Sequence, residues 1–128
     1  MSKNKINIAV IGATGFTGLD LVYLLSNHSK VRISYLCATK SVGKKISFFD
    51  KRIKKKMPTI SSIKNINWKK VDIVFLSLPN GEAQKIILKI YSKFKNLRFI
   101  DLSADFRIKN IKTYKKNYKI KHHAPKLL

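Results

Sequence analysis

The first 25 residues combine an apolar run, a glycine-rich turn and an amphipathic segment. Residues 6–11 form an apolar run of strand length, and the turn after it carries glycines at positions 12, 15 and 18. Gly12 allows a tight turn, Gly15 lets the backbone approach a phosphate, and Gly18 lets the following helix pack close to a sheet. Because a strand, a turn and a helix all agree with this spacing, the sequence predicts a dinucleotide-binding site at the turn.

Strand-like and helix-like segments alternate along most of the chain. Strands are expected at residues 31–38, 71–78 and 97–101, and a second helix begins at Glu82. This alternation predicts an α/β fold, a Rossmann-like parallel sheet with helices on both faces. The apolar stripes expected to be buried are Gly18, Leu21, Val22 and Leu25 in the first helix, and Ala83, Ile86, Ile87, Ile90, Tyr91 and Phe94 in the second.

Two parts of the chain give weaker signals. Residues 39–70 predict a surface excursion with a short helix and a minor strand near 59–63. The last 21 residues are rich in lysine. We therefore divide the chain into a cofactor-binding domain at residues 1–108 and a basic tail at residues 109–128.

The net charge of +22, from 28 Lys and Arg against 6 Asp and Glu, has two explanations. One is a polyanionic partner such as a nucleic acid, and the other is compositional drift toward lysine. Only four of the cations are arginine, the residue preferred for reading phosphates and bases, so drift is favoured and no specific nucleic acid is expected. No apolar stretch reaches the roughly 20 residues of a membrane span. One cysteine and no leader-like start predict a cytoplasmic protein.

The end of the second expected strand indicates which dinucleotide binds. NAD-specific sites place an acidic residue about 20 positions past the glycines to hold the ribose hydroxyls. Residues 37–45 hold no carboxylate but several hydroxyl and ammonium groups, which predicts NADP as the cofactor. The residues expected to bind it are Gly12, Ala13, Thr14, Gly15, Phe16, Thr17, Thr39, Lys40, Ser41, Lys44, Leu78, Pro79 and Asn80.

The cysteine and the two adjacent histidines do not form a recognisable catalytic or metal site in the sequence. Cys37 lies on the adenosine side of the expected site and is interpreted as a small buried residue, so no catalytic residue is assigned. His122 and His123 are adjacent and lack the spacing of metal ligands, and no metal site is expected. Near the last expected strand end, Ser103, Asp105 and Arg107 are candidates for contact with a substrate, although the spacing of the two charged residues favours a structural ion pair.

Several motifs resemble, in order and spacing, the N-acetyl-γ-glutamyl-phosphate reductase family. They lie at residues 12–18, 39–44, 72–81 and 100–107, and the segment 114–128 is similar to the family's next motif. The resemblance implies NADPH-dependent reduction of an acyl phosphate to a semialdehyde in arginine biosynthesis, through a thioester on a cysteine. In family members that cysteine lies shortly beyond the position of Leu128, and a catalytic histidine lies further on, in the substrate domain. We therefore expect only the cofactor-binding part of a two-domain fold, inactive alone, and a separate chain with the catalytic domain is a partner to consider.

Three residues differ from the family's usual pattern, and other families remain as alternative assignments. Asn80, Asn117 and Lys126 stand where the family commonly has His, Trp and an acidic residue. The glycine turn is shared with aspartate-semialdehyde dehydrogenases, so an aspartate- or aminoadipate-type enzyme is the nearest alternative. A basic nucleic-acid-binding protein and a non-functional gene remnant are alternatives of other classes.

Overall fold

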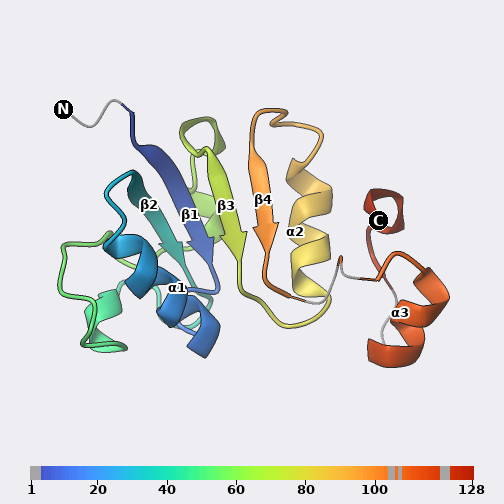
Figure 1. The fold of residues 1–128 in the computed structure, drawn as a ribbon, viewed down its shortest axis with the longest axis horizontal. Helices are drawn as coiled ribbons and strands as arrows, with labels where there is room; N and C mark the ends of the chain where they lie inside the picture. The colour runs from blue at the N-terminus through green and yellow to red at the C-terminus, as the bar shows by residue number, and fades with distance from the viewer. Residues whose placement is uncertain (1–3, 104–105, 107, 119–121) are drawn as a thin grey trace.

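The computed structural model describes residues 4–103, 106, 108–118 and 122–128 of the chain. Four strands, β1 (Ile6–Ile11), β2 (Val31–Cys37), β3 (Ile73–Leu76) and β4 (Arg98–Asp101), form one sheet. Their order is β2-β1-β3-β4 and all neighbouring pairs are parallel, as Figure 1 shows. The predicted α/β fold is confirmed. Since the chain leaves β1 toward β2 and returns to the other side of β1, the strand order reverses between β1 and β3.

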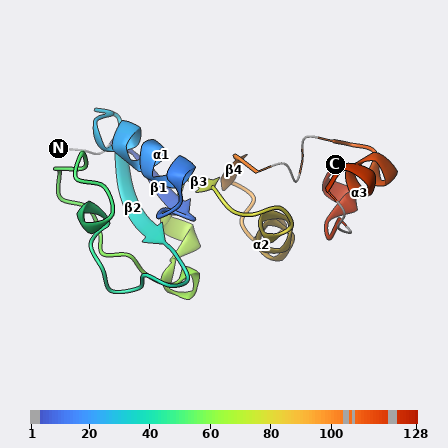
Figure 2. The same cartoon turned by 90° about the horizontal axis from the view of Figure 1, so that it is seen from below.

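Helices cover both faces of the sheet, as predicted. Figure 2 shows α1 (Phe16–Ser26) and α2 (Glu82–Ile90) on opposite sides of it. Strand β1 supplies both layers, because its side chains alternate between the two faces. Ile8 and Val10 belong to the apolar cluster that contains Val22 of α1, while Ala9 and Ile11 belong to the cluster on the α2 side.

The helices differ in detail from the stripes expected for them. Leu21 and Leu25 are half-buried, not buried. The second stripe was expected to run to Phe94, but α2 ends at Ile90. Tyr91 is 54% exposed, so its predicted burial is wrong. The Tyr91 backbone is still helical and its N–H donates to the Ile87 carbonyl at 2.8 Å, but its ring reaches the edge strand β4, where the Phe99 ring covers only part of it.

The segment between β2 and β3 is more than a surface excursion. It contains short 3₁₀ helices at Ile46–Phe48, Ile63–Asn65 and Trp68–Lys70. Ile46, Ile53 and Ile60 are at most 2% exposed and pack in the cluster on the α1 side, which the sequence did not predict. The minor strand expected near residues 59–63 is reduced to an isolated parallel bridge between Cys37 and Ser61.

The C-terminal segment is attached to α2 by polar contacts. It contains α3 (Ile111–Tyr118), which Figures 1 and 2 place beyond α2, and a 3₁₀ turn at Pro125–Leu127. Gln84 of α2 and Tyr114 of α3 are fully buried. The Gln84 side-chain amide donates to the Tyr114 hydroxyl and accepts from the backbone N–H of His123. These contacts join residues on both sides of the boundary proposed at residue 108, which stays a prediction.

The two neighbouring histidines have different surroundings. His122 is 2% exposed, and its Nδ1 accepts from the backbone N–H of Ala124 at 3.0 Å, whereas His123 is exposed. The described residues contain no group of three or more His, Cys, Asp or Glu side chains that could bind a metal ion. None of the helices in the described ranges has the length and apolar character that a membrane span requires.

Candidate functional site

The glycine turn joins the carboxyl ends of β1, β2 and β3. Gly12 has φ +85°, a conformation that favours glycine, and its N–H and that of Ala13 donate to the carbonyl of Cys37 at 2.9 and 3.0 Å. A Cβ on Gly12 would lie 2.0 Å from the carbonyl oxygen of Ser77. Position 12 therefore accepts no side chain without displacing the end of β3.

The next two glycines shape the start of α1. A Cβ on Gly18 would lie 2.1 Å from the Gly12 carbonyl oxygen, so the helix is pressed directly against the turn. Gly15 caps the helix without a side-chain hydrogen bond, and the nearest atom to a Cβ there is 3.9 Å away. The first-turn amides lack intrahelical partners and carry the positive end of the helix dipole. Because space is left beside them, this helix start fits a phosphate group.

A pocket of about 450 Å³ opens at the same edge of the sheet. It lies where the strand order reverses, the usual ligand position in open parallel sheets. Its walls come from the glycine turn, the end of β2, the returning segment before the second 3₁₀ helix, and the start of α2. The lining residues are Ile11, Gly12, Thr14, Gly15, Cys37, Ala38, Thr39, Val42, Ser62, Ile63, Ser77, Leu78, Pro79, Glu82 and Ile86.

The structure brings together only part of the predicted cofactor set. Six of the predicted residues line the pocket, namely Gly12, Thr14, Gly15, Thr39, Leu78 and Pro79. Ala13 is buried beneath the turn, Ser41 is 9% exposed, and Phe16, at 95% exposure, projects away from the core. Thr17, Lys40, Lys44 and Asn80 are exposed and lie outside this lining. The Lys44 ammonium lies over the Phe48 ring, 5.1 Å from its centroid. Cofactor binding by any of these residues stays a prediction.

Sequence reasoning did not assign several residues of the pocket. Ser77 and Glu82 flank the predicted segment 78–80, so strand and helix boundaries could have suggested them. Ser62 and Ile63 had no local signal, because their position depends on how the segment after β2 returns to the sheet.

Cys37 is at the base of the pocket but is poorly suited to act as a nucleophile. It is 2% exposed, and its Sγ lies 3.9 Å from the Ser61 hydroxyl. Burial raises the pKa of the Cys37 thiol, which disfavours the reactive thiolate. The interpretation of Cys37 as a small buried residue is confirmed.

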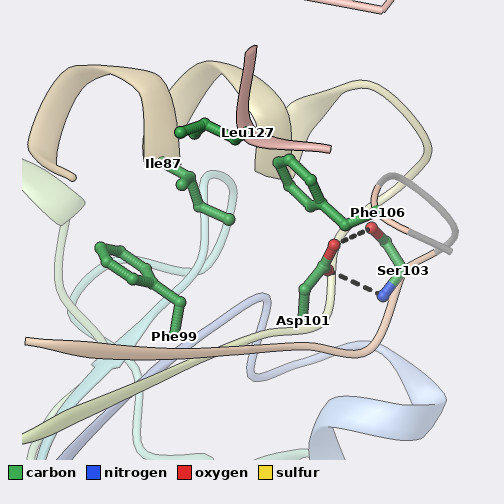
Figure 3. A pocket seen from close by; sticks show the side chains of 6 residues that line it. All are labelled: Ile87, Phe99, Asp101, Ser103, Phe106 and Leu127. Atoms are coloured by element: carbon green, nitrogen blue, oxygen red, sulfur yellow. Dashed lines mark hydrogen bonds between the residues drawn. The ribbon is translucent and has the colours of Figure 1, made fainter. Parts of the chain in front are cut away.

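A second pocket, of about 340 Å³, lies beyond the end of β4 (Figure 3). The Asp101 carboxylate accepts hydrogen bonds from the backbone N–H and the hydroxyl of Ser103, both at 2.9 Å. The other walls are apolar and come from Ile87, Phe99, Phe106 and Leu127. Of the substrate-side candidates, Ser103 lines this pocket, while Asp105 and Arg107 lie outside the described residues.

A parallel sheet with a strand-order reversal, a phosphate-fitting helix start and a pocket beside it defines a dinucleotide-binding α/β domain. The model of the family described as "Semialdehyde dehydrogenase, NAD binding domain" matches residues 7–126. The chain therefore belongs to this family of oxidoreductase domains.

Curated relatives agree with the motif resemblance. The N-acetyl-gamma-glutamyl-phosphate reductase of Ehrlichia ruminantium (strain Gardel) is 46% identical over 126 residues, which cover 97% of this chain and 35% of the relative. A probable chloroplastic N-acetyl-gamma-glutamyl-phosphate reductase of Oryza sativa subsp. japonica is 38% identical over 127 residues, 98% of this chain and 30% of the relative. The chain thus spans about a third of the length of these relatives and corresponds to their cofactor-binding portion.

Solved structures show the same fold. An aspartate semialdehyde dehydrogenase with NADP from Candida albicans superposes with a TM-score of 0.60 at 23% identity, covering 80% of this chain and 31% of that chain. At this identity the likeness concerns the fold alone.

Proposed function

We propose that this chain is the cofactor-binding portion of an NADPH-dependent N-acetyl-γ-glutamyl-phosphate reductase of arginine biosynthesis. The observation that carries the proposal is the pocket beside Gly12 and Gly15 in a chain 46% identical to reductases of that name. The substrate would be a small acyl phosphate, reduced to a semialdehyde, and the cell compartment would be the cytoplasm.

The start of α1 and the glycine turn would have different roles in binding the dinucleotide. The α1 amides after Gly15 would bind the pyrophosphate, and Gly12 would keep the backbone close to it. When bound, the cofactor supplies a hydride, and the protein orients it and keeps water out. The apolar lining of the pocket would exclude water around the bases.

The preference for NADPH over NADH rests on the β2 side of the pocket. The lining there comes from Cys37, Ala38, Thr39 and Val42, none of which is acidic. A 2′-phosphate would meet the Thr39 hydroxyl, with Lys40, Ser41 and Lys44 on the same loop.

Titration of the purified chain with NADPH and NADH at fixed salt tests this preference. Tighter binding of NADPH is expected, and equal affinities would refute the assignment of the 2′-phosphate site. Salt must be held constant because a net charge of +22 attracts any polyanion at low ionic strength.

Turnover would require residues from outside this chain. Cys37 is buried at the β2 end of the pocket, and burial disfavours its thiolate form. We therefore propose that residues 1–128 do not reduce N-acetyl-γ-glutamyl phosphate alone, and that the catalytic cysteine comes from a further domain or a separate chain. An NADPH-oxidation assay with that substrate tests this. Turnover lost in Cys37→Ser would show that Cys37 is catalytic, and turnover kept in that variant would show chemistry elsewhere in the chain.

A further inference from the structure

We propose that a lysine-lined pocket on the segment between β2 and β3 binds an oligophosphate, a ligand with two or more linked phosphate groups. The pocket has a volume of about 290 Å³, at the small end for ligand pockets, which suits a compact ligand. It shares no residue with the pocket beside the glycine turn. The site is therefore separate from the one proposed for the dinucleotide.

Ammonium and hydroxyl groups make up the polar part of the lining. They belong to Lys45, Lys54, Lys55, Lys56, Ser47 and Thr59. In the part of the chain that the structure describes, no acidic side chain lines the pocket and none of the four lysines forms an ion pair. Like charges held close together repel one another, so an anion that lies between them is stabilised.

The backbone that carries these groups is anchored on both sides of the pocket. Ile46 and Ile53 are 2% and 1% exposed and pack in the apolar cluster on the α1 side. The N–H of Ile60, which is also buried, donates to the Lys44 carbonyl at 3.0 Å and joins the two ends of the loop. A ligand would have to order only the ends of the lysine side chains, which keeps the entropic cost of binding low.

Lysine in place of arginine favours phosphate over carboxylate as the recognised group. An arginine fork matches the two oxygens of a carboxylate, whereas an ammonium acts as a point charge and suits the several negative charges of linked phosphates. Ser47 and Thr59 add hydroxyl donors for phosphate oxygens. The lining contains no arginine, and Arg52 of the same loop pairs with Asp20 and Asp50 instead.

Compositional drift toward lysine explains a basic surface but not the convergence of four lysines on one pocket. Helix α3 is also rich in lysine, and Lys112, Lys115 and Lys116 are exposed there. They line neither this pocket nor the two pockets described above. Figures 1 and 2 place α3 at the opposite end of the molecule from residues 45–59. Substitutions on α3 can therefore remove the same charge without touching the pocket.

The test follows the amide chemical shifts of the ¹⁵N-labelled chain by NMR during titration with inorganic triphosphate. At about 0.15 M salt, charges more than about 8 Å apart are largely screened, so contacts within the pocket dominate. We expect saturable shifts at residues 45–59. The double variant Lys54→Gln/Lys55→Gln should bind triphosphate at least about tenfold more weakly, because two of the four ammonium contacts are lost.

The matched control is the double variant Lys115→Gln/Lys116→Gln on α3. It removes two neighbouring, exposed lysines and the same charge, and it should change the affinity for triphosphate by less than about twofold. Because all four substituted side chains are exposed, both double variants should fold.

ATP and adenosine distinguish two sources of linked phosphates. Adenosine should leave the shifts of residues 45–59 unchanged, since it carries no phosphate. Tighter binding of ATP than of triphosphate would identify a nucleotide as the ligand, and equal affinities would identify a free phosphate chain. Shifts at residues 45–59 with adenosine alone would contradict recognition through phosphate.

Three further outcomes would overturn the proposal. Shifts confined to residues 12–16 would assign phosphate binding to the glycine turn alone. Equal losses in the two double variants would show attraction to the net charge of +22 and not to a pocket. A dissociation constant weaker than about 10 mM for residues 45–59 would mean that the lysines form no site.

Discussion

The pocket beside the glycine turn is lined by two regions whose conformations are fixed by different interactions. The glycine turn at residues 12–18 is held by close backbone contact, with no room for a Cβ at Gly12 or Gly18. The second region, residues 39–63, which we call the returning segment, is held by three buried isoleucines, by backbone hydrogen bonds within it, and by the bond from the Ser61 N–H to the Leu36 carbonyl of β2. The first region tolerates almost no substitution at Gly12 and Gly18, whereas the second depends on burial that many apolar residues could supply. The difference explains why only the first region is recognisable in the sequence.

The largest expected effect tests the close packing of the turn. In Gly12→Val, the new side chain would meet the Ser77 carbonyl, and φ +85° would strain the backbone. We expect a loss of about 3 kcal/mol or more in the free energy of unfolding and no detectable NADPH binding. Urea unfolding and a cofactor titration measure the two effects.

Gly43→Val is the matched control for that substitution. Gly43 also has a positive φ, +92°, but no atom lies within 4 Å of the position of a Cβ. Only the backbone strain should appear, about 1–2 kcal/mol. Equal losses in the two variants would mean that close contact at Gly12 is not what holds the turn.

The next largest effect tests burial in the returning segment. Ile53 is 1% exposed, so Ile53→Ala should leave a cavity and cost about 2–4 kcal/mol in the free energy of unfolding. Ile111→Ala, at a 47% exposed position, should change it by less than about 0.5 kcal/mol. If both changes cost the same small amount, residues 39–63 would be the surface excursion that the sequence suggested.

The glycine turn could be predicted from the sequence, whereas the packing of the returning segment could not. The turn was predictable because its requirement is local, and a glycine spacing between a strand and a helix is seldom accidental. Ile53 gave no signal because an isoleucine among lysines can be buried only by contacts distant in the sequence. Tyr91 was wrongly placed because helical spacing gives the direction of its side chain but not what covers it, and at the edge strand β4 only the Phe99 ring lies beside it. In the site, Gly12, Gly15 and Pro79 line the pocket and their cofactor binding stays a prediction, whereas the place of Ile63 depends on the bridge between Cys37 and Ser61, 24 residues apart.

A smaller effect is expected where the C-terminal segment meets α2, a region held by a buried polar contact. Tyr114→Phe removes the hydroxyl that accepts from the Gln84 side chain. We expect a loss of about 1–2 kcal/mol in the free energy of unfolding, because a buried amide loses an acceptor. Faster hydrogen exchange at the His123 amide, which donates to Gln84, should accompany it. Tyr91→Phe, at an exposed tyrosine, is the control, and an equal loss there would show that the Gln84 contact contributes nothing specific.

The smallest effect concerns the charged contact that ties the returning segment to α1. Arg52 pairs with Asp50 at 2.7 Å and with Asp20 of α1 at 2.6 Å, and its guanidinium lies over the Tyr23 ring. Hydrogen bonds from Arg52 lower the pKa of Asp50, and the same contacts raise the pKa of Arg52. A carboxyl group whose pKa is lowered by folding stabilises the fold above its ordinary pKa of about 4, and the stabilisation is lost as the pH falls through the folded value.

Asp50→Asn should therefore lower the thermal midpoint slightly at pH 7 and low salt, and the difference from the unsubstituted chain should shrink as the pH falls below the ordinary carboxyl pKa of about 4. The effect should be small because ion pairs at the surface are screened by solvent and salt. In an Arg52→Gln background the same substitution should have a smaller effect at pH 7, because the guanidinium hydrogen bond that lowers the pKa of Asp50 most is gone while the backbone N–H of residue 52 remains. A difference that does not shrink on acidification, or that keeps its full size in the Arg52→Gln background, would show that the ion pair with the guanidinium is not how Asp50 contributes.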